Sequence, residues 1–194
     1  MKVSTKKLAV TAIFAAIASV LMFLNFPVPL MPPFIKFDFS DLPALLISFA
    51  YGPLYGIVVC LIKNIVNFPF STASYVGVLS NFLLGVLFVV PAGLIYKIKK
   101  CRAFALTGLI FGTVLMSLVS ILTNYYIIFP FYTTLMPLDT IMSAFTEINP
   151  NVDGLLSAIL MFNFPFNLIK GAICSLITFI VYKKLSPILK DSSL

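Results

Sequence analysis

The sequence predicts an all-α integral membrane protein with six transmembrane helices and cytoplasmic N and C termini. Of its 194 residues, 61% are hydrophobic and only 10% are charged, and the mean hydropathy is +1.11. These values leave too little polar surface for a soluble domain. Apolar runs long enough to cross a bilayer recur along the chain with no soluble segment between them, so we expect a single multi-pass membrane domain, 1–194.

The first predicted helix covers residues 7–25. A signal peptide would occupy the same place, but residues 25–29 contain no small-residue cleavage site, so the run is interpreted as a transmembrane helix. Small residues recur along it at spacings of three and four, namely Ala9, Ala12, Ala16 and Ser19. Such a row lets another helix approach closely in a bilayer, and it predicts either a docking face for a partner protein or packing within this chain.

The second and third helices are predicted at 42–53 and 54–70. Hydropathy alone would fuse them, but Gly52-Pro53 is a turn signal. Splitting the run there gives six crossings, and the remaining helices follow at 74–96, 104–128 and 154–182. Three basic groups then fall on one side, as the positive-inside rule requires: Lys2, Lys6 and Lys7; Lys97, Lys99, Lys100 and Arg102; Lys183, Lys184 and Lys190. Topology therefore explains the net charge of +7, and no nucleic-acid partner is implied.

Several chemistries are excluded. The chain has no histidine, and Cys60, Cys101 and Cys174 lack the spacing of metal or redox ligands, so we predict no metal, no cofactor and no catalytic residue. No P-loop motif is present, and energy from ATP must come from a partner. Every acidic residue lies in a predicted loop or at a helix end, so the carboxylates that usually carry protons or sodium ions inside the membrane are missing, which argues against ion-coupled transport. We predict a protein that is not an enzyme.

Three polar residues mark the candidate site. Asn163, Asn167 and Lys170 stand at helical positions i, i+4 and i+7 inside a very apolar stretch, so they share one helix face. That face must point into the protein or a cavity because a lysine at this depth is costly in lipid. We expect the face to contact a polar ligand, and the alternative for Lys170 is an internal ion pair.

The loop between the first two helices contains four prolines and four phenylalanines, which predicts a stiff, apolar segment that folds over a ligand site. Its candidate rim residues are Phe34, Lys36, Phe37 and Asp38. An interfacial belt of aromatic residues is the alternative. Asp41 is predicted to cap the second helix, and Lys63 to pair with Asp38 or Asp41.

Several motifs, in order, resemble those of the riboflavin-specific S components of energy-coupling factor (ECF) vitamin transporters. They are the runs Pro32–Leu46, Tyr51–Gly56, Leu61–Asn64 and Asn167–Lys170, together with Ala12-x-x-x-Ala16 on the first helix. Each motif alone is weak, and their order over nearly the whole chain makes the resemblance specific.

The resemblance implies a riboflavin-binding subunit without catalytic activity that captures the vitamin from outside. A transmembrane T component, which meets the alanine motif, and two cytoplasmic ATPases would drive uptake. The implied pocket lies under the first loop and between helices four to six, where Asn167 and Lys170 match the family's polar pair and Asn124 is our choice for its helix-five asparagine. Aromatic walls are expected from Phe34, Tyr125, Phe131 and Phe166.

Riboflavin has a planar ring with an edge of alternating donors and acceptors, which suits a pocket of fixed amides and apolar walls. Two alternatives remain open. One is an S component for a different vitamin. The other is a stand-alone membrane facilitator, which would need a polar path through both leaflets, whereas the inner halves of the predicted spans are almost wholly apolar.

Overall fold

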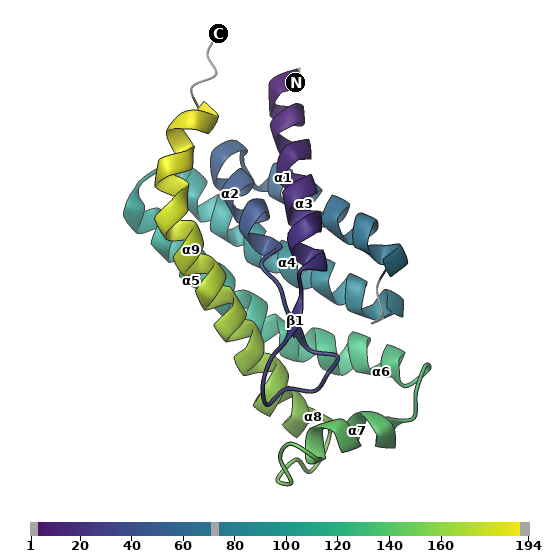
Figure 1. Cartoon of the computed structure of the whole chain (residues 1–194). Coiled ribbons are helices and arrows are strands. Elements are labelled where there is room, and N and C mark those ends of the chain that lie inside the picture. The colour runs from purple at the N-terminus through teal and green to yellow at the C-terminus, as the bar shows by residue number, and fades with distance from the viewer. Residues whose placement is uncertain (1–3, 71–73, 191–194) are drawn as a thin grey trace.

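The computed structural model describes residues 4–70 and 74–190. Within them the chain is almost entirely helical (Figure 1). The long helices are α1 (Thr5–Phe23), α2 (Asp41–Tyr51), α3 (Pro53–Asn67), α4 (Ser74–Ile98), α5 (Arg102–Thr123) and α9 (Phe164–Lys190). The shorter elements are β1 (Phe26–Pro27), β2 (Lys36–Phe37), the 3₁₀ turn η1 (Phe68–Phe70), the π-helical segments η2 (Asn124–Ile128) and η3 (Ile159–Asn163), α6 (Phe129–Tyr132), α7 (Leu138–Thr146) and α8 (Leu155–Ala158).

Five segments of the described chain are long and apolar enough to cross a membrane: Thr5–Phe23, Pro53–Phe70, Tyr75–Ile98, Arg102–Tyr132 and Leu155–Lys184. They agree with five of the six predicted spans to within a few residues. The sixth, α2, is apolar but has only 11 residues, which corresponds to roughly 16 Å of helix and is short of a full crossing. The predicted all-α membrane fold is confirmed.

The predicted break between the second and third helices is also confirmed. Gly52 has φ 108°, in the region that favours glycine, and it ends α2 while Pro53 begins α3. The two helices therefore form a tight hairpin. Without this turn a single continuous helix would carry the following residues to the wrong side of the bundle.

Glycines allow α4 and α5 to approach closely. A Cβ atom added to Gly108 would lie 2.7 Å from the backbone oxygen of Ala92, and one added to Gly112 would lie 2.6 Å from that of Phe88. Such contacts are closer than real Cβ atoms tolerate. The Gly108-x-x-x-Gly112 pair is thus a packing device of the kind common between membrane helices, and its partner is α4 of the same chain.

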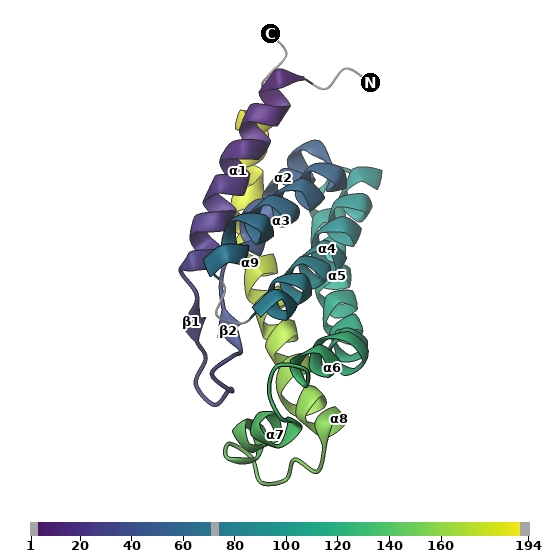
Figure 2. The same cartoon turned by 90° about the vertical axis from the view of Figure 1, so that its right-hand side faces the viewer.

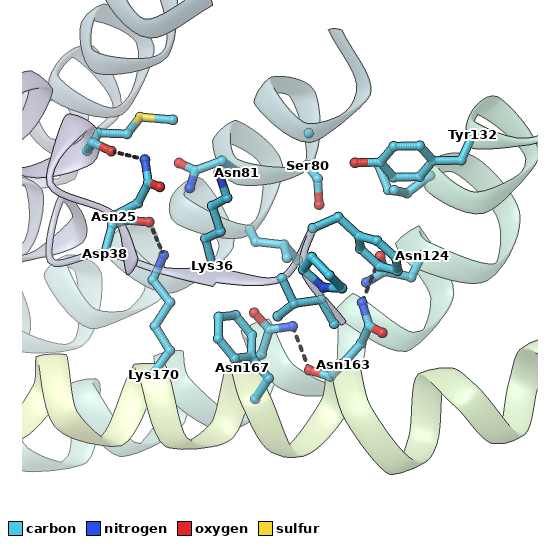
Figure 3. Close-up of a pocket in the computed structure, with 18 of the residues that line it drawn as sticks. Asn25, Lys36, Asp38, Ser80, Asn81, Asn124, Tyr132, Asn163, Asn167 and Lys170 are labelled. Carbon is cyan, nitrogen blue, oxygen red and sulfur yellow. Dashed lines mark hydrogen bonds and ion pairs between the residues drawn. The ribbon is translucent and has the colours of Figure 1, made fainter. Parts of the chain in front are cut away.

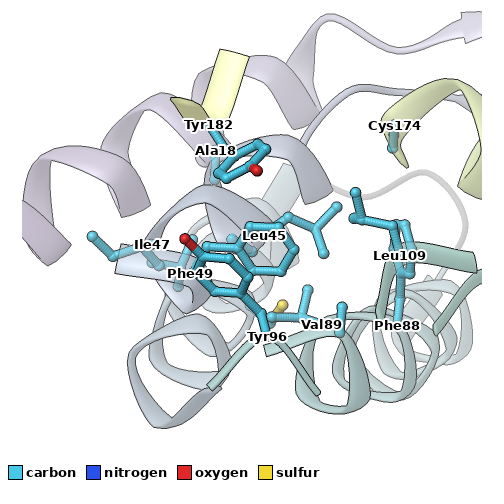
Figure 4. Packing of buried hydrophobic residues seen from close by; sticks show 14 of the residues in the cluster. Ala18, Leu45, Ile47, Phe49, Phe88, Val89, Tyr96, Leu109, Cys174 and Tyr182 are labelled. Carbon is cyan, nitrogen blue, oxygen red and sulfur yellow. The ribbon is translucent and has the colours of Figure 1, made fainter. Parts of the chain in front are cut away.

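Aromatic rings hold together the end of the bundle that carries both termini (Figures 1 and 4). The ring of Phe49 stacks on Tyr96 with 4.5 Å between centroids, and Tyr182 meets both rings edge-on at 5.7 Å. The Lys7 ammonium lies 5.8 Å from the centroid of the Tyr51 ring. The basic groups near residues 7, 97–102 and 183 therefore gather at one end, as the charge pattern predicts.

The opposite end is built differently (Figure 2). There β1 pairs antiparallel with β2, with Phe26 opposite Phe37, and α7 lies across the mouth of the bundle. We call residues 24–40, which connect α1 to α2 and contain the β1–β2 pair, the hairpin loop. A second apolar cluster forms at this end around Phe129, Phe145 and Phe162, and it includes Ile35 from the hairpin loop. Neither the strand pair nor α7 is predicted from hydropathy, because neither belongs to a membrane-spanning run.

We expect Gly112→Ala to lower the Tm of the purified protein by several degrees, because overpacking against a backbone atom costs about 1–3 kcal/mol. Gly154→Ala is the matched control, since a Cβ there meets nothing within 4 Å and the backbone is extended at φ 171°. Thermal unfolding in detergent measures both. Equal Tm values for the two variants would contradict the close α4–α5 packing.

Candidate ligand-binding site

A cavity of about 600 Å³ lies at the end of the bundle opposite the basic groups, and Figure 3 shows residues that line it. This volume is within the range of small-molecule sites, roughly 300–1,000 Å³. Its lining residues come from most of the chain: the end of α1, the hairpin loop, the start of α2, α3 with η1, α4, α5 with η2 and α6, α7, and η3 with α9. The lining includes seven of the eight residues predicted to bind ligand: Asn124, Asn163, Asn167, Lys170, Phe34, Lys36 and Asp38.

Three asparagines form one polar wall of the cavity. The Asn124 side-chain amide donates to the Ser120 carbonyl at 2.7 Å, and the Asn163 amide donates to Asn124 Oδ1 at 3.4 Å. The Asn167 amide donates to the Asn163 carbonyl at 2.8 Å. These bonds hold the three amides in fixed orientations, and the buried Asn163 Oδ1 makes no hydrogen bond with the described residues. It remains available to accept one from a ligand.

The three asparagines lie in or next to two π-helical segments, one that follows α5 and one that precedes α9. Asn124 begins η2 and Asn163 ends η3. A π segment adds a residue to a turn and shifts the faces that follow it, and such segments occur often at functional sites. They bring the amides from two neighbouring helices to face one another, an arrangement that helical spacing within a single helix does not reveal.

A buried ionic cluster forms the floor of the cavity. Lys63 Nζ lies 2.6 Å from Asp41 Oδ1, while Lys170 Nζ lies 3.0 Å from Asp38 Oδ2 and 3.3 Å from Asp41 Oδ2. The Ser40 hydroxyl accepts from Lys63 at 2.7 Å and donates to Asp38. Two lysines face two aspartates, so the cluster carries no net charge, and each charged side chain has partners inside the apolar bundle.

The geometry of the cluster tests three predictions made from the sequence. The predicted pairing of Lys63 is confirmed, with Asp41 as its partner. The predicted capping role of Asp41 is wrong, because α2 has no side-chain cap and the carboxylate of Asp41 turns toward the two lysines instead. Lys170 lines the cavity but is held by both aspartates, which is the internal pairing named as its alternative.

The hairpin loop covers the cavity with some of the predicted residues. The Phe34 ring contacts Phe145 of α7 edge-on at 5.5 Å and lines the cavity. Phe37 is 6% exposed but is absent from the lining, because its ring packs behind the loop against Phe26, Phe39 and Phe166. The predicted rim position of Phe37 is therefore wrong, although the loop does fold over the site.

Two of the four aromatic walls were also predicted wrongly. Phe34 and Phe166 line the cavity, whereas Tyr125 and Phe131 do not, and they are 39% and 55% exposed on the outside of the bundle. In their place the cavity has Phe129, four residues after Tyr125, and Tyr132, one residue after Phe131. The sequence offers many aromatic residues here, and the π segment η2 changes the helical register in a way that the sequence does not reveal.

Other cavity residues escape the sequence reasoning altogether. Asn67 of α3 and Ser80 and Asn81 of α4 form a second polar wall, and Thr140 of α7 closes the mouth. A search for asparagines within apolar spans could have found Asn67 and Asn81. The contribution of α7 has no such signal because the helix lies outside the spans.

The small-residue row on α1 divides into two faces. Ala9, Ala12 and Ala16 are exposed, whereas Ser19 is 5% exposed, and its hydroxyl donates to the Ala15 carbonyl. Ala15 and Ala18 pack against the rest of the bundle. Ser19 therefore does not belong to an exposed face, whereas the three alanines lie on the exposed surface of α1.

Residues 6–182 match the family described as "ECF transporter, substrate-specific component". The chain is 38% identical to "Riboflavin transporter RibU" of Staphylococcus aureus (strain TCH60), over 95% of this chain and 93% of the relative. It is 34% identical to "Riboflavin transporter FmnP" of Bacillus subtilis (strain 168), over 94% and 93% respectively. A solved structure described as "Structure and mechanism of the S component of a bacterial ECF transporter" matches with a TM-score of 0.76 at 37% identity, over 95% of this chain and 98% of that one.

We expect Lys63→Met to destabilise the protein by about 3–5 kcal/mol, because Asp41 would lose its shortest ion pair in the bundle interior. Lys183→Met, at an exposed position on α9, should leave the Tm almost unchanged. Adding Asp41→Asn to Lys63→Met removes both charges and should recover part of the loss. Equal Tm values for Lys63→Met and Lys183→Met would contradict a structural role for the cluster.

Proposed function

This chain belongs to the family of ECF transporter substrate-specific components, and we propose that it is the subunit that binds riboflavin for uptake. The observation that carries the proposal is the wall of three fixed asparagine amides in a cavity that also has aromatic sides. The riboflavin transporters that the chain resembles at 34% and 38% identity support the choice of vitamin.

The chemistry of the wall suits the flavin ring. One edge of the isoalloxazine carries an N–H donor between two carbonyl acceptors. The unpaired Oδ1 of Asn163 can accept from that N–H, and the amide groups of Asn124 and Asn167 can donate to the carbonyls. Because these groups are already oriented by hydrogen bonds to the helices, little ordering is needed on binding. Phe34 and Phe166 cover the faces of the ring.

Lys170 and Asp38 act on the ligand from the floor of the cavity. Their 3.0 Å ion pair ties the hairpin loop to α9, so it keeps Phe34 and Lys36 over the ligand. Lys36 is exposed at the mouth. In this account Phe37 contributes indirectly, through its packing against Phe166.

The cavity opens toward the outside of the cell. It lies at the end of the bundle opposite the basic groups near residues 7, 97–102 and 183, and basic groups favour the cytoplasmic side. The chain has no P-loop motif. A transmembrane T component and two cytoplasmic ATPases therefore supply the energy, and the exposed Ala9, Ala12 and Ala16 form the face of α1 that meets the T component.

We expect Asn167→Ala to weaken riboflavin binding roughly 5- to 100-fold, because a hydrogen bond in a dry pocket contributes about 1–3 kcal/mol. Quenching of flavin fluorescence by the purified protein measures the affinity. Leu168→Ala is the matched control, since its side chain is 38% exposed on the outer side of the same helix. Unchanged affinity in Asn167→Ala would remove this asparagine from the site.

We expect the double variant Ala12→Leu with Ala16→Leu to bind riboflavin normally and to lose uptake into cells. Larger side chains prevent close approach of a partner helix, whereas the cavity has no lining residue at either position. Ile13→Leu with Ile17→Leu, at exposed positions of the same helix, is the control. Normal uptake and normal co-purification of the ATPases in the alanine variant would show that the T component docks elsewhere.

A further inference from the structure

The end of the bundle that carries both termini is strongly basic, and the cavity lies at the other end (Figure 1). The described acidic residues lie elsewhere, in the buried cluster or in and after α7: Asp38, Asp41, Asp139, Glu147 and Asp153. The exposed basic residues of the terminal end, within the described chain, are Lys6, Lys7, Lys97, Lys99, Lys100, Arg102, Lys183 and Lys184. Among the described residues no carboxylate pairs with them, so this end attracts anions from outside the chain.

Two helices bring part of this charge together. The helices α5 and α9 run side by side, and the Thr113 and Ser175 hydroxyls join them at 3.0 Å (Figure 1). Because α5 begins at the basic end and α9 ends there, residues before Thr113 lie alongside residues after Ser175. Arg102 precedes Thr113 by roughly 16 Å of helix, and Lys183 follows Ser175 by roughly 12 Å. The two cations therefore lie at the same end of the contact between α5 and α9.

An apolar row runs along α5 from Arg102 toward the middle of the bilayer. Leu106 and Ile110 follow Arg102 at positions i+4 and i+8, so the three side chains share one helix face. Leu106 is 45% exposed and Ile110 is 55% exposed. Leu106 also stands two helical turns before Thr113, which places the row beside the contact with α9.

A matching row runs along α9. Leu176 and Ile180 precede Lys183 by seven and three residues, and they are 62% and 59% exposed. Leu176 directly follows Ser175, so this row borders the same helix contact from the other side. The two rows and their cations together are named the α5–α9 seam: Arg102, Leu106, Ile110, Leu176, Ile180 and Lys183.

We propose that the α5–α9 seam binds an anionic phospholipid from the leaflet that meets the basic end. Its phosphodiester lies between Arg102 and Lys183, and its acyl chains follow the two apolar rows. A guanidinium forms two parallel hydrogen bonds with a phosphate, and an ammonium adds a point charge. Basic sites between membrane helices on the cytoplasmic side bind anionic head groups in this way. A soluble anion would satisfy the cations only, whereas a phospholipid satisfies the cations and the apolar rows together.

The seam is separate from the other two surfaces of the protein that are proposed to bind a partner. The helix α1, which carries the exposed alanines, packs on α2 and α3, whereas the seam belongs to α5 and α9. None of the six seam residues lines the cavity. Lipid binding at the seam therefore does not depend on whether the cavity holds riboflavin.

The location of the lipid can be measured with phosphatidylglycerol that carries a photoreactive diazirine on an acyl chain. The purified protein is placed in phosphatidylcholine nanodiscs with a small fraction of this probe, and labelled peptides are identified by mass spectrometry. Peptides that contain residues 106–110 and 176–180 should be labelled most strongly. Unlabelled phosphatidylglycerol should compete, and additional phosphatidylcholine should not. Even labelling of all helices, or equal competition by both lipids, would overturn the proposal.

Variants test the two cations. Arg102→Gln with Lys183→Gln should lower labelling of the seam more than tenfold, because each basic side chain near the surface strengthens anionic-lipid binding about fivefold. Lys6→Gln with Lys7→Gln is the matched control, since it removes the same charge from the same end but on α1. This control should keep labelling within twofold. Equal losses in the two double variants would show a general effect of surface charge and would overturn a site at the seam.

Two further comparisons separate the loss of the site from the loss of the fold and from the binding of a soluble anion. Arg102→Lys with Lys183→Arg keeps both charges and should restore most of the labelling. Phosphatidylglycerol should raise the Tm of the unmodified protein in detergent, whereas inorganic phosphate should not. Labelling that stays low in the charge-conserving variant, or equal stabilisation by phosphate alone, would overturn the proposal.

Discussion

The structure depends on a charge-neutral cluster buried in an apolar bundle. Asp38 comes from the hairpin loop, Asp41 from the start of α2, Lys63 from α3 and Lys170 from α9, so four separate segments meet in one network. An isolated charge at this depth would be prohibitively costly, and each of these residues is tolerable only because the others are in place. The requirement fixes the loop against α3 and α9 and thereby gives the cavity its floor.

Close helix packing provides the frame for that cluster. Gly85 lies so near to Asp41 that a Cβ atom would be 3.2 Å from its carboxylate oxygen, and Gly108 and Gly112 bring α5 against α4. The aromatic contacts among Phe49, Tyr96 and Tyr182 close the terminal end of the bundle. The other end encloses the cavity, which the loop and α7 cover, and the apolar cluster around Phe129, Phe145 and Phe162 packs beside it. One end is thus packed and the other is built to receive a ligand.

The sequence predicts the membrane fold well because length and hydropathy report directly on bilayer crossing. It also places Asn163, Asn167 and Lys170 correctly on one helix face, and that face lines the cavity. It fails where a residue's role depends on distant partners or on local register. The pairing of Lys170 with Asp38 joins residues 132 positions apart, and η2 turns Tyr125 and Phe131 away from the cavity that Phe129 and Tyr132 line. Neither effect has a periodic signature.

The most direct measurement of the central claim is a structure of the purified protein with riboflavin bound. We expect one flavin in the cavity, with its ring between Phe34 and Phe166 and its N–H edge at Asn163, and with the Lys170–Asp38 ion pair intact beneath it. A flavin bound outside this cavity, or one that enters only after that ion pair is broken, would contradict it.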